Sequence, residues 1–381
     1  MNKSTNSRHP FIEIAGKKIG LDYPCFIVAE ISANHRQKFD EAVRLIQKAA
    51  EAGADAVKLQ TATPDLLTIN SKKPPFIIRG KNLPKIWRGK NLYQLYEVAY
   101  TPWEWYPKLA KIAQSLGVIL FSTPFGNTAV DFLQEQNVPC YKIASYEALD
   151  VPLLRKVAAT GKPIIISQGF YPFKDVEFSI RTLREAGANE IAVLYCVTEY
   201  TNKPRVKDSN LATMKDIAQR LGVVVGFSDN NGGVEIPTIA AFLGASIIEK
   251  HFILSREGEG LDAQFSIEPK ELSVMIKAIR KNEETEDKVS LNTLSEEAVK
   301  KALGKVKYGN STRKAAEIKK FCRSLFVVKD LKKGKKLTSV SIRSIRPAAG
   351  LSPKFWDEVI GKKAKVDIEY GTPLSWDLIT K

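Results

Sequence analysis

The sequence predicts an α/β protein: a (β/α)8 TIM barrel followed by a small C-terminal domain rich in β-strands. Two observations predict the barrel: short apolar, β-branched runs recur eight times along the chain, and helical patterns separate them. A third observation indicates the second domain, because the sequence becomes charged and then strand-like after about residue 282. The length agrees, since 381 residues exceed one ordinary core and suggest about two domains.

The eight strand-like runs are nearly continuous in apolar residues, which is typical of strands buried on both faces of a parallel sheet. They lie at residues 25–31, 56–61, 118–124, 140–145, 163–169, 191–197, 223–229 and 246–252. Because strands and helices alternate along the chain, we expect the strands to close into a (β/α)8 barrel.

The helical patterns between these runs have clear starts and stops. In residues 38–54, Phe39, Ala42 and Ile46 recur at helical spacing, and Gly53 follows as a stop signal. Residues 102–117 begin with a proline in the first turn and end at a glycine. The connection at about 62–101 is long for a barrel loop, so we expect an insertion able to fold over the barrel mouth.

The rest of the chain is expected to fold separately. We place the barrel domain at residues 1–282, a charged helical or extended linker at 283–321, and the β-rich C-terminal domain at 322–381. The last of these is too small to be more than an accessory domain.

Composition narrows the class of protein. No run of 18 or more apolar residues is present and the first residues lack a signal-peptide core, so we expect a soluble, cytoplasmic protein without a membrane partner. The net charge of +16 suits an anionic partner, but no aromatic-interleaved basic motif indicates nucleic acid. A phosphorylated substrate fits at least as well. The four cysteines lack CxxC spacing and are expected to be reduced core thiols: Cys25, Cys140, Cys196 and Cys322.

Polar side chains gather where the predicted strands end, and active sites of TIM barrels lie at that end. They are Glu30, Lys58, Gln60, Ser122, Thr123, Lys142, Ser145, Glu147, Ser167, Tyr195, Thr198, Ser228, Asp229, Glu249, Lys250 and His251. A lysine inside an apolar run, such as Lys142, is costly unless it pairs with a charge or binds an anion. Two lysines and several hydroxyls at one mouth suit a phosphate or carboxylate, with Glu30 and Glu147 as an acid and a base.

Each of these residues also has a structural interpretation. A single lysine at a barrel mouth often forms an ion pair, a serine or threonine at a strand end often caps the next helix, and His251 alone suits a core position. The residue pattern by itself therefore predicts a barrel enzyme that acts on an anion.

An ordered set of motifs resembles the sialic acid synthase (NeuB) family, and the likeness covers about residues 11–381. The motifs are AEISANH (29–35), VKLQT (57–61), FSTPF (121–125), KIASYEALD (142–150), GKPIIISQG (161–169), GFSD (226–229), IIEKHF (247–252) and FSIEP (265–269). Three further stretches look closer still to the pseudaminic acid synthase branch: 91–105, 344–353 and 371–379.

The resemblance implies a reaction in which phosphoenolpyruvate condenses with the open-chain aldehyde of an amino hexose to give a nine-carbon acid and phosphate. In the pseudaminate branch the acceptor is 2,4-diacetamido-2,4,6-trideoxy-L-altropyranose. Glu147 would act as a base toward water, with Glu30 beside the sugar hydroxyls, and Gln60 and Asp262 would contact the sugar. By motif match, phosphoenolpyruvate would be held by Lys58, Thr123, Lys142, Ser145 and Ser167.

The resemblance also implies a partner subunit. The C-terminal stretch is similar to the antifreeze-like (SAF) domain of this family, which reaches over the partner's active site in a homodimer. Its RPG arginine corresponds to Arg346, although the motif here reads RPAAG. We expect Arg346 to contact the sugar; the structural alternative is a surface ion pair.

The family pattern is altered at the metal site. The family implies Mn2+ or Mg2+ as a Lewis acid on the aldehyde oxygen. Its SDHT motif reads SDNN here, so Asn230 stands where a ligand histidine is usual, and we expect Asn230 and Asp229 as oxygen ligands. Tyr195 falls at the position of a second histidine. Three outcomes stay open: the metal is held through these oxygens, the metal binds only when phosphoenolpyruvate is present, or the metal site is weakened.

Three functions therefore stay open. The leading one is a pseudaminic acid synthase, with an N-acetylneuraminate or legionaminate synthase as the nearest alternative. The second is a class I aldolase that forms a Schiff base on Lys142 or Lys58. The third is a sugar-binding paralogue with weak or no catalysis.

Overall fold

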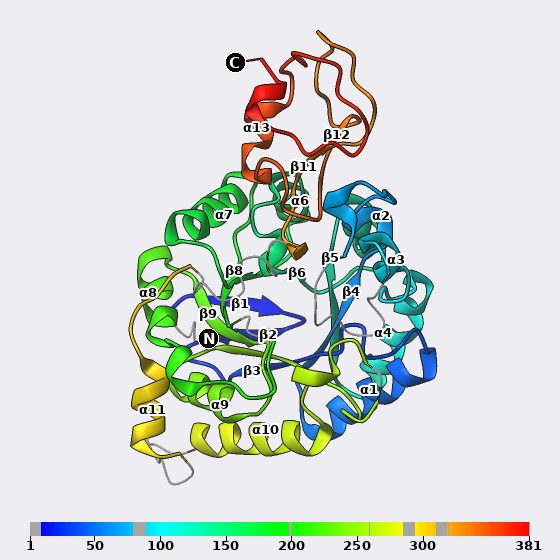
Figure 1. Ribbon diagram of the computed structural model, residues 1–381. Helices are drawn as coiled ribbons and strands as arrows, with labels where there is room; N and C mark the ends of the chain where they lie inside the picture. Colours follow the sequence, from blue (N-terminus) through cyan, green and yellow to red (C-terminus); the bar gives the residue numbers. More distant parts are fainter. Residues whose placement is uncertain are drawn as a thin grey trace, which may run out of the picture.

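The computed structural model describes residues 9–78, 89–197, 200–258, 260–284, 294–309, 318 and 320–380. Its centre is a closed barrel of eight parallel strands, in the order β10-β3-β4-β5-β6-β7-β8-β9 (Figure 1). The strands are β3 Phe26–Glu30, β4 Ala56–Thr61, β5 Ile119–Pro124, β6 Tyr141–Ile143, β7 Ile164–Gln168, β8 Ile191–Val197, β9 Val224–Asp229 and β10 Ile247–His251. The predicted TIM barrel is confirmed, with each strand inside its predicted run.

Helices follow the strands and cover the outside of the barrel (Figure 1). The helix predicted at 38–54 is present, and Gly53 ends it with a φ of 93°, a left-handed conformation that glycine adopts easily. The helices are α1 Phe39–Ala52, α2 Pro64–Leu67, α3 Leu92–Glu97, α4 Tyr106–Ser115, α5 Asn127–Glu135, α6 Val151–Ala158, α7 Phe173–Glu185, α8 Ala212–Leu221, α9 Glu235–Phe242, α10 Pro269–Glu283 and α11 Glu296–Leu303. No helix in the described part of the chain is long and apolar enough to cross a membrane.

A hairpin that the sequence analysis did not identify closes one end of the barrel. Strands β1 (Phe11–Ile14) and β2 (Lys17–Gly20) pair in antiparallel fashion. Ile12, Ile14 and Ile19 are buried in one cluster with residues from the amino-terminal parts of the barrel strands, such as Phe26. Because this end is filled, the polar side chains at the opposite strand ends surround the open mouth.

The long connection between β4 and α4 forms part of the rim of the mouth. It contains α2, a 3-10 turn at Pro74–Phe76 and α3, whose first turn is fixed by a capping box between Asn91 and Gln94. Both short helices contribute to one apolar cluster, which also includes Phe125 from the end of β5. The expected insertion over the mouth is therefore an ordered wall in its described residues.

The C-terminal domain has its own small core and packs against the rim, beside α2 and α6 (Figure 1). It contains β11 (Ser324–Val327), β12 (Ile342–Ile345) and α13 (Trp356–Val359). Contacts with the barrel include ion pairs from Arg155 to Asp357 and from Lys354 to Asp175. The exact domain boundaries stay a prediction.

Candidate active site

A cavity of about 500 Å3 opens at the C-terminal ends of the barrel strands. Side chains from the strands line its floor, and side chains from α3, from the loops and from the C-terminal domain line its sides. Twelve of the polar residues named from the sequence line this cavity: Glu30, Lys58, Gln60, Lys142, Ser145, Ser167, Ser228, Asn230, Glu249, His251, Asp262 and Arg346.

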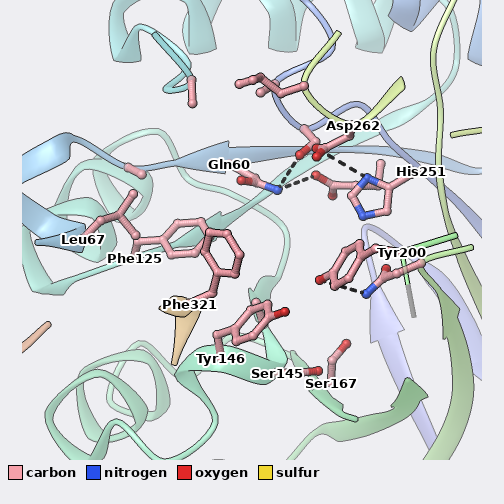
Figure 2. A pocket seen from close by; sticks show the side chains of 18 of the residues that line it. Gln60, Leu67, Phe125, Ser145, Tyr146, Ser167, Tyr200, His251, Asp262 and Phe321 are labelled. Atoms are coloured by element: carbon pink, nitrogen blue, oxygen red, sulfur yellow. Dashed lines mark hydrogen bonds and ion pairs between the residues drawn. The ribbon is translucent and has the colours of Figure 1, made fainter. Parts of the chain in front are cut away.

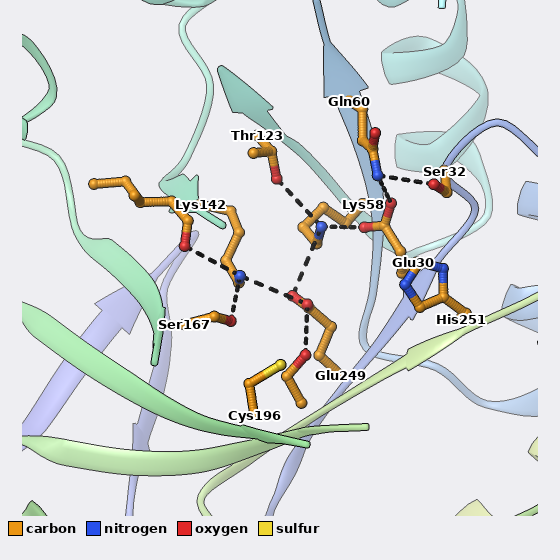
Figure 3. Close-up of polar contacts among 12 residues, drawn as sticks. Glu30, Ser32, Lys58, Gln60, Thr123, Lys142, Ser167, Cys196, Glu249 and His251 are labelled. Atoms are coloured by element: carbon orange, nitrogen blue, oxygen red, sulfur yellow. Dashed lines mark hydrogen bonds and ion pairs between the residues drawn. The ribbon is translucent and has the colours of Figure 1, made fainter. Parts of the chain in front are cut away.

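The floor of the cavity is a chain of alternating charges (Figure 3). Lys58 Nζ contacts a Glu30 carboxylate oxygen and lies 3.8 Å from Glu249 Oε2. Lys142 Nζ lies 3.6 Å from Glu249 Oε1 and donates to Ser167 Oγ at 2.6 Å. Two buried lysines from different strands thus share one carboxylate, Glu249.

Burial and these contacts shift the pKa values in different directions. Burial lowers the pKa of Lys142, although Glu249 opposes the change. Burial also acts to lower the pKa of Lys58, but Glu249 and Glu30 outweigh it and raise this pKa. Burial raises the pKa of Glu30 to about 7, against the pull of Lys58. Glu30 is thus a carboxyl group that changes its charge near neutral pH.

Thr123 extends the floor without lining the cavity. Lys58 Nζ donates to its Oγ1 at 3.2 Å, so Thr123 orients the ammonium group from behind. On the other side, Gln60 Nε2 donates to Glu30 Oε1 at 3.1 Å and to Ser32 Oγ at 2.8 Å. Gln60 thereby fixes the direction of the Glu30 carboxyl group.

Glu147 does not lie where the sequence analysis expects a base. It is fully buried, it is absent from the cavity lining, and its Oε1 accepts from Arg346 Nη2 at 2.7 Å and from Arg323 Nε at 3.0 Å. Both arginines belong to the C-terminal domain. Glu147 therefore anchors this domain to the barrel and holds Arg346 at the cavity wall.

Arg346 lies inside the molecule, which excludes the alternative of a surface ion pair. Besides Glu147, its guanidinium group lies 5.4 to 5.6 Å from the ring centroids of Tyr96, Phe125 and Tyr146. Its Nη1 donates to Tyr96 Oη at 3.2 Å, while its buried Nε has no hydrogen-bond partner among the described residues. An unpaired donor at a cavity wall is available to a ligand.

Asp229 also differs from its expected role. Its Oδ2 accepts from Lys250 Nζ at 2.7 Å, its Oδ1 accepts from the backbone and side chain of Asn231, and it does not line the cavity. Both carboxylate oxygens are therefore used within the protein. This arrangement does not favour Asp229 as a metal ligand.

Two other groups fit a metal ion better. Asn230 donates from Nδ2 to Cys196 Sγ and Tyr200 Oη, which leaves its carbonyl oxygen for a ligand. His251 lines the same cavity, and its buried Nδ1 has no hydrogen-bond partner in the described part of the chain, with Asp262 Oδ2 at 3.9 Å (Figure 2). Burial, reinforced by Lys58, Lys250 and Lys142, lowers the pKa of His251 and keeps the imidazole neutral, as a metal ligand must be.

These two groups make a weak site. Among the described residues, no cluster of three or more His, Cys, Asp and Glu side chains has the geometry of a metal site. One imidazole nitrogen and one amide oxygen fit Mn2+ or Mg2+ only when substrate or water oxygens complete the coordination.

The sequence does not reveal the roles of three residues in this region. Glu249 is visible only as a polar residue at a strand end, because its position between two lysines depends on how β4, β6 and β10 lie in the barrel. Arg323 carries no local signal, since a single arginine at the start of a strand is common. His251 lies in the IIEKHF motif, and this motif is the sequence feature that could have indicated its role.

Comparisons with known proteins agree with this architecture. The chain matches the NeuB family over residues 45–290 and the SAF domain over residues 323–380. A TIM barrel with polar strand ends that is followed by a SAF domain defines the class: a biosynthetic enzyme of the sialic acid synthase type. The chain belongs to the NeuB family, and the resemblance noted in the sequence is confirmed.

Individual relatives extend over nearly the whole chain. Pseudaminic acid synthase of Helicobacter pylori is 40% identical over 94% of this chain and 98% of its own length. The crystal structure of the spore coat polysaccharide biosynthesis protein SpsE from Bacillus subtilis aligns with a TM-score of 0.81 and 34% identity, covering 98% of this chain and 99% of its own. That of N-acetylneuraminic acid synthetase from Leptospira borgpetersenii aligns with a TM-score of 0.63 and 26% identity, covering 82% and 97%.

Proposed function

We propose that this protein condenses phosphoenolpyruvate with the open-chain form of a 2,4-diacetamido-6-deoxyhexose, which is pseudaminic acid synthase activity. The observation that carries the proposal is the floor of the cavity, where Lys58 and Lys142 meet beside hydroxyl groups. Phosphoenolpyruvate carries a carboxylate and a phosphate on three carbons, so it needs two cations close together and several donors. The identity to a named pseudaminic acid synthase over nearly the full length supports the acceptor class.

Each step of the proposed reaction requires particular groups of the site. Phosphoenolpyruvate lies on Lys58, Lys142, Ser145 and Ser167, and its C3 forms a bond to the aldehyde carbon of the sugar. Water then adds to C2, and the C2–O bond to phosphate breaks, which leaves a 2-keto acid and inorganic phosphate. The aldehyde oxygen gains a proton as it becomes a hydroxyl group.

Glu30 is the group best suited to that proton transfer. It lines the cavity, Gln60 fixes its direction, and burial raises its pKa to about 7, so part of the population carries a proton at neutral pH. For Glu147 we propose a positioning role, because it holds Arg346 instead of facing the cavity. Arg346 Nε donates a hydrogen bond to an acetamido oxygen of the sugar. Asp262 and Gln60 accept hydrogen bonds from the hydroxyl groups of the sugar.

Asn230 and His251 would hold a divalent cation, Mn2+ or Mg2+, beside the acceptor. When bound there, the cation would supply Lewis-acid polarisation of the aldehyde oxygen. The protein's own contribution is to present one neutral imidazole and one amide oxygen and to leave the other positions for substrate and water.

The partner arrangement is a separate proposal. Within the described chain, the C-terminal domain contacts the chain's own barrel through Arg323, Arg346 and Lys354. We propose a homodimer in which the same contacts form between the C-terminal domain of one chain and the barrel of the other, because the contacting side chains do not belong to the linker. Mixing the variants Lys142→Met and Arg346→Met checks this: activity should recover, since one site of the mixed dimer then has both original residues.

We further propose that the enzyme works in the cytoplasm, where phosphoenolpyruvate is produced.

The proposed activity has a direct test. Enzyme, phosphoenolpyruvate and 2,4-diacetamido-2,4,6-trideoxy-L-altrose with Mn2+ should release inorganic phosphate, and a chelator should reduce the rate because only two protein ligands hold the cation. N-acetylmannosamine and the acceptor of legionaminate synthases are the comparison substrates. No phosphate release with any of them would refute the proposal.

A class I aldolase is the second candidate, because burial lowers the pKa of Lys142 and an uncharged amine can form a Schiff base. Borohydride added with pyruvate separates the two. We expect no increase in protein mass, whereas an aldolase would retain a reduced pyruvyl adduct on a lysine.

The charge state of Glu30 predicts how phosphoenolpyruvate binding depends on pH. Below about pH 7 Glu30 is protonated and Lys58 is free for the anion; above this pH the carboxylate holds Lys58 and repels the ligand. We therefore expect the dissociation constant for phosphoenolpyruvate to rise as pH increases from 7 to 8.5, by up to about tenfold per pH unit. Calorimetric titration measures it, and Glu30→Gln should remove the dependence. The same slope in Glu30→Gln would assign it to another group.

A further inference from the structure

One loop carries several of the side chains that line the side of the cavity. It follows β10, its described residues are 253–258 and 260–266, and we call it the β10 loop. The loop contributes four residues to the cavity lining: Leu261, Asp262, Gln264 and Phe265. The ring of Phe265 packs edge-to-face against that of His251, with 5.0 Å between the ring centroids. The position of this loop therefore sets where Asp262 lies and what packs on His251, which lie on the same side of the cavity (Figure 2).

The two ends of the β10 loop are joined by backbone hydrogen bonds. The amide of Ile253 donates to the carbonyl oxygen of Ile267 at 3.0 Å, and the amide of Ile267 donates to that of His251 at 2.9 Å. On the outside, Arg256 forms ion pairs with two glutamates of the chain around the start of α10, but these groups are partly exposed and contribute little. The residues that reach the cavity therefore need a further anchor.

A buried asparagine from another loop supplies this anchor. Asn34 follows β3, is almost fully buried and does not line the cavity. Its Nδ2 donates to the carbonyl oxygen of Phe252 and to Ser266 Oγ, both at 2.9 Å, and its Oδ1 accepts from the amide of Asp262 at 3.3 Å. Both protons of Nδ2 and the amide oxygen are thus used on the β10 loop and the residue before it.

The groups around Asn34 are closely packed. Ser266 Oγ donates to the carbonyl oxygen of Asp262 at 2.7 Å, so the amide and the carbonyl of Asp262 are both held through Asn34, directly and by way of Ser266. Gly260 lies against the same side chain, because a Cβ at this position would be 2.8 Å from Asn34 Oδ1, closer than such atoms can pack. The loop thus fits around the asparagine in one position.

We propose that Asn34 is a positioning residue, which holds the β10 loop so that Asp262 and Phe265 face the cavity. This inference rests on the proposed condensation, in which Asp262 contacts the acceptor, and adds a residue that acts through Asp262 without touching a substrate. Phosphoenolpyruvate lies on the lysines and serines at the floor, and the three side-chain hydrogen bonds of Asn34 involve none of them. Loss of Asn34 should therefore affect the acceptor more than phosphoenolpyruvate.

Asn34→Ala removes all three hydrogen bonds without adding a charge. We expect kcat/KM for 2,4-diacetamido-2,4,6-trideoxy-L-altrose to fall by about 10- to 100-fold, because a contact displaced by about 1 Å costs this much. The dissociation constant for phosphoenolpyruvate, measured by calorimetric titration without added metal, should stay within about twofold. Ser266→Ala removes only one partner of Asn34 and should shift the acceptor value in the same direction by a smaller factor.

Hydrogen–deuterium exchange tests the anchor independently of any activity. Amides of the β10 loop should exchange about tenfold faster or more in Asn34→Ala, and also faster in Ser266→Ala, because each change removes hydrogen bonds that close the loop.

Asn210→Ala is the matched control. Asn210 is also buried and holds a loop, since it donates to the carbonyl oxygen of Asp208 and accepts from the amide of Lys305, but it does not line the cavity. Its φ of 48° makes alanine unfavourable there, so this variant should lose at least as much stability as Asn34→Ala. It should keep the original kcat/KM for the acceptor and the original exchange of the β10 loop.

The outcomes separate this inference from the proposed function. Unchanged exchange of the β10 loop in both Asn34→Ala and Ser266→Ala would overturn the anchor. Faster exchange without a loss for the acceptor, with an equal loss for phosphoenolpyruvate, or with the same acceptor loss in Asn210→Ala would leave Asn34 a structural residue and overturn its positioning role. No phosphate release by the original protein would refute the condensation, while the exchange rates would still decide whether Asn34 holds the loop.

Discussion

Replacing Lys142 by methionine is expected to lower kcat/KM for phosphoenolpyruvate by about 10²- to 10³-fold while leaving the fold intact. The loss follows from removing one of two ammonium groups that face a doubly anionic substrate in a site shielded from water. The fold tolerates the change because Glu249, the carboxylate that Lys142 faces, keeps Lys58 as a second counterion. Steady-state phosphate release and thermal unfolding measure the two effects.

A surface lysine provides the control for this variant. Lys156 on α6 forms an exposed ion pair with Asp131, so Lys156→Met should change neither kcat/KM nor the unfolding temperature beyond about 3 °C. If Lys142→Met instead retained the original kcat/KM for phosphoenolpyruvate, the substrate would not lie on the floor described here. A large fall in its unfolding temperature would show that Lys142 is mainly a structural ion pair.

Replacing Lys250 by methionine is expected to cause a large loss of stability, whereas Lys142→Met lowers kcat/KM and leaves the fold intact. Lys250 and Asp229 are both completely buried and lie outside the cavity lining, and Lys250 also donates to the backbone carbonyl of Asn231. Removing one partner of such a pair leaves a buried charge without compensation, which costs about 3–5 kcal/mol. The apparent unfolding temperature should fall by roughly 10 °C.

A second substitution shows whether the unpaired carboxylate of Asp229 causes this loss of stability. Asp229→Asn combined with Lys250→Met removes both charges and keeps an oxygen that accepts from Asn231. The double variant should recover at least half of the lost unfolding temperature, so the two changes are strongly non-additive. Additive losses would mean that Lys250 stabilises the barrel by packing alone and not by pairing with Asp229.

The contrast between these lysines shows how far sequence reasoning reaches. Both lysines lie in apolar strand runs, and both were correctly placed near the ends of their strands. Alternation along a strand cannot tell which one faces the cavity and which one meets a carboxylate of the neighbouring strand. That depends on the register, which places Lys250 opposite Asp229 across β10 and β9.

The candidate site divides in the same way. Lys58, Lys142 and Ser167 were predicted to be at the mouth, and the structure brings them together. Glu147 and Asp229 were also predicted there, but each pairs with a basic side chain of another element and does not line the cavity. Glu147 pairs with Arg323 and Arg346, which are distant in sequence, and Asp229 pairs with Lys250 on the neighbouring strand. A local sequence pattern cannot predict such a partner.

The sequence by itself determined the number and order of the barrel strands, the end at which polar groups gather, and the family. It could do so because strand burial and strand-end chemistry are written in short, contiguous patterns. Only the tertiary structure decided that Glu249 joins two lysines and that Arg346 reaches the cavity. These features depend on distances between segments far apart in the chain, and such distances are set by barrel closure and by how the C-terminal domain packs on the rim.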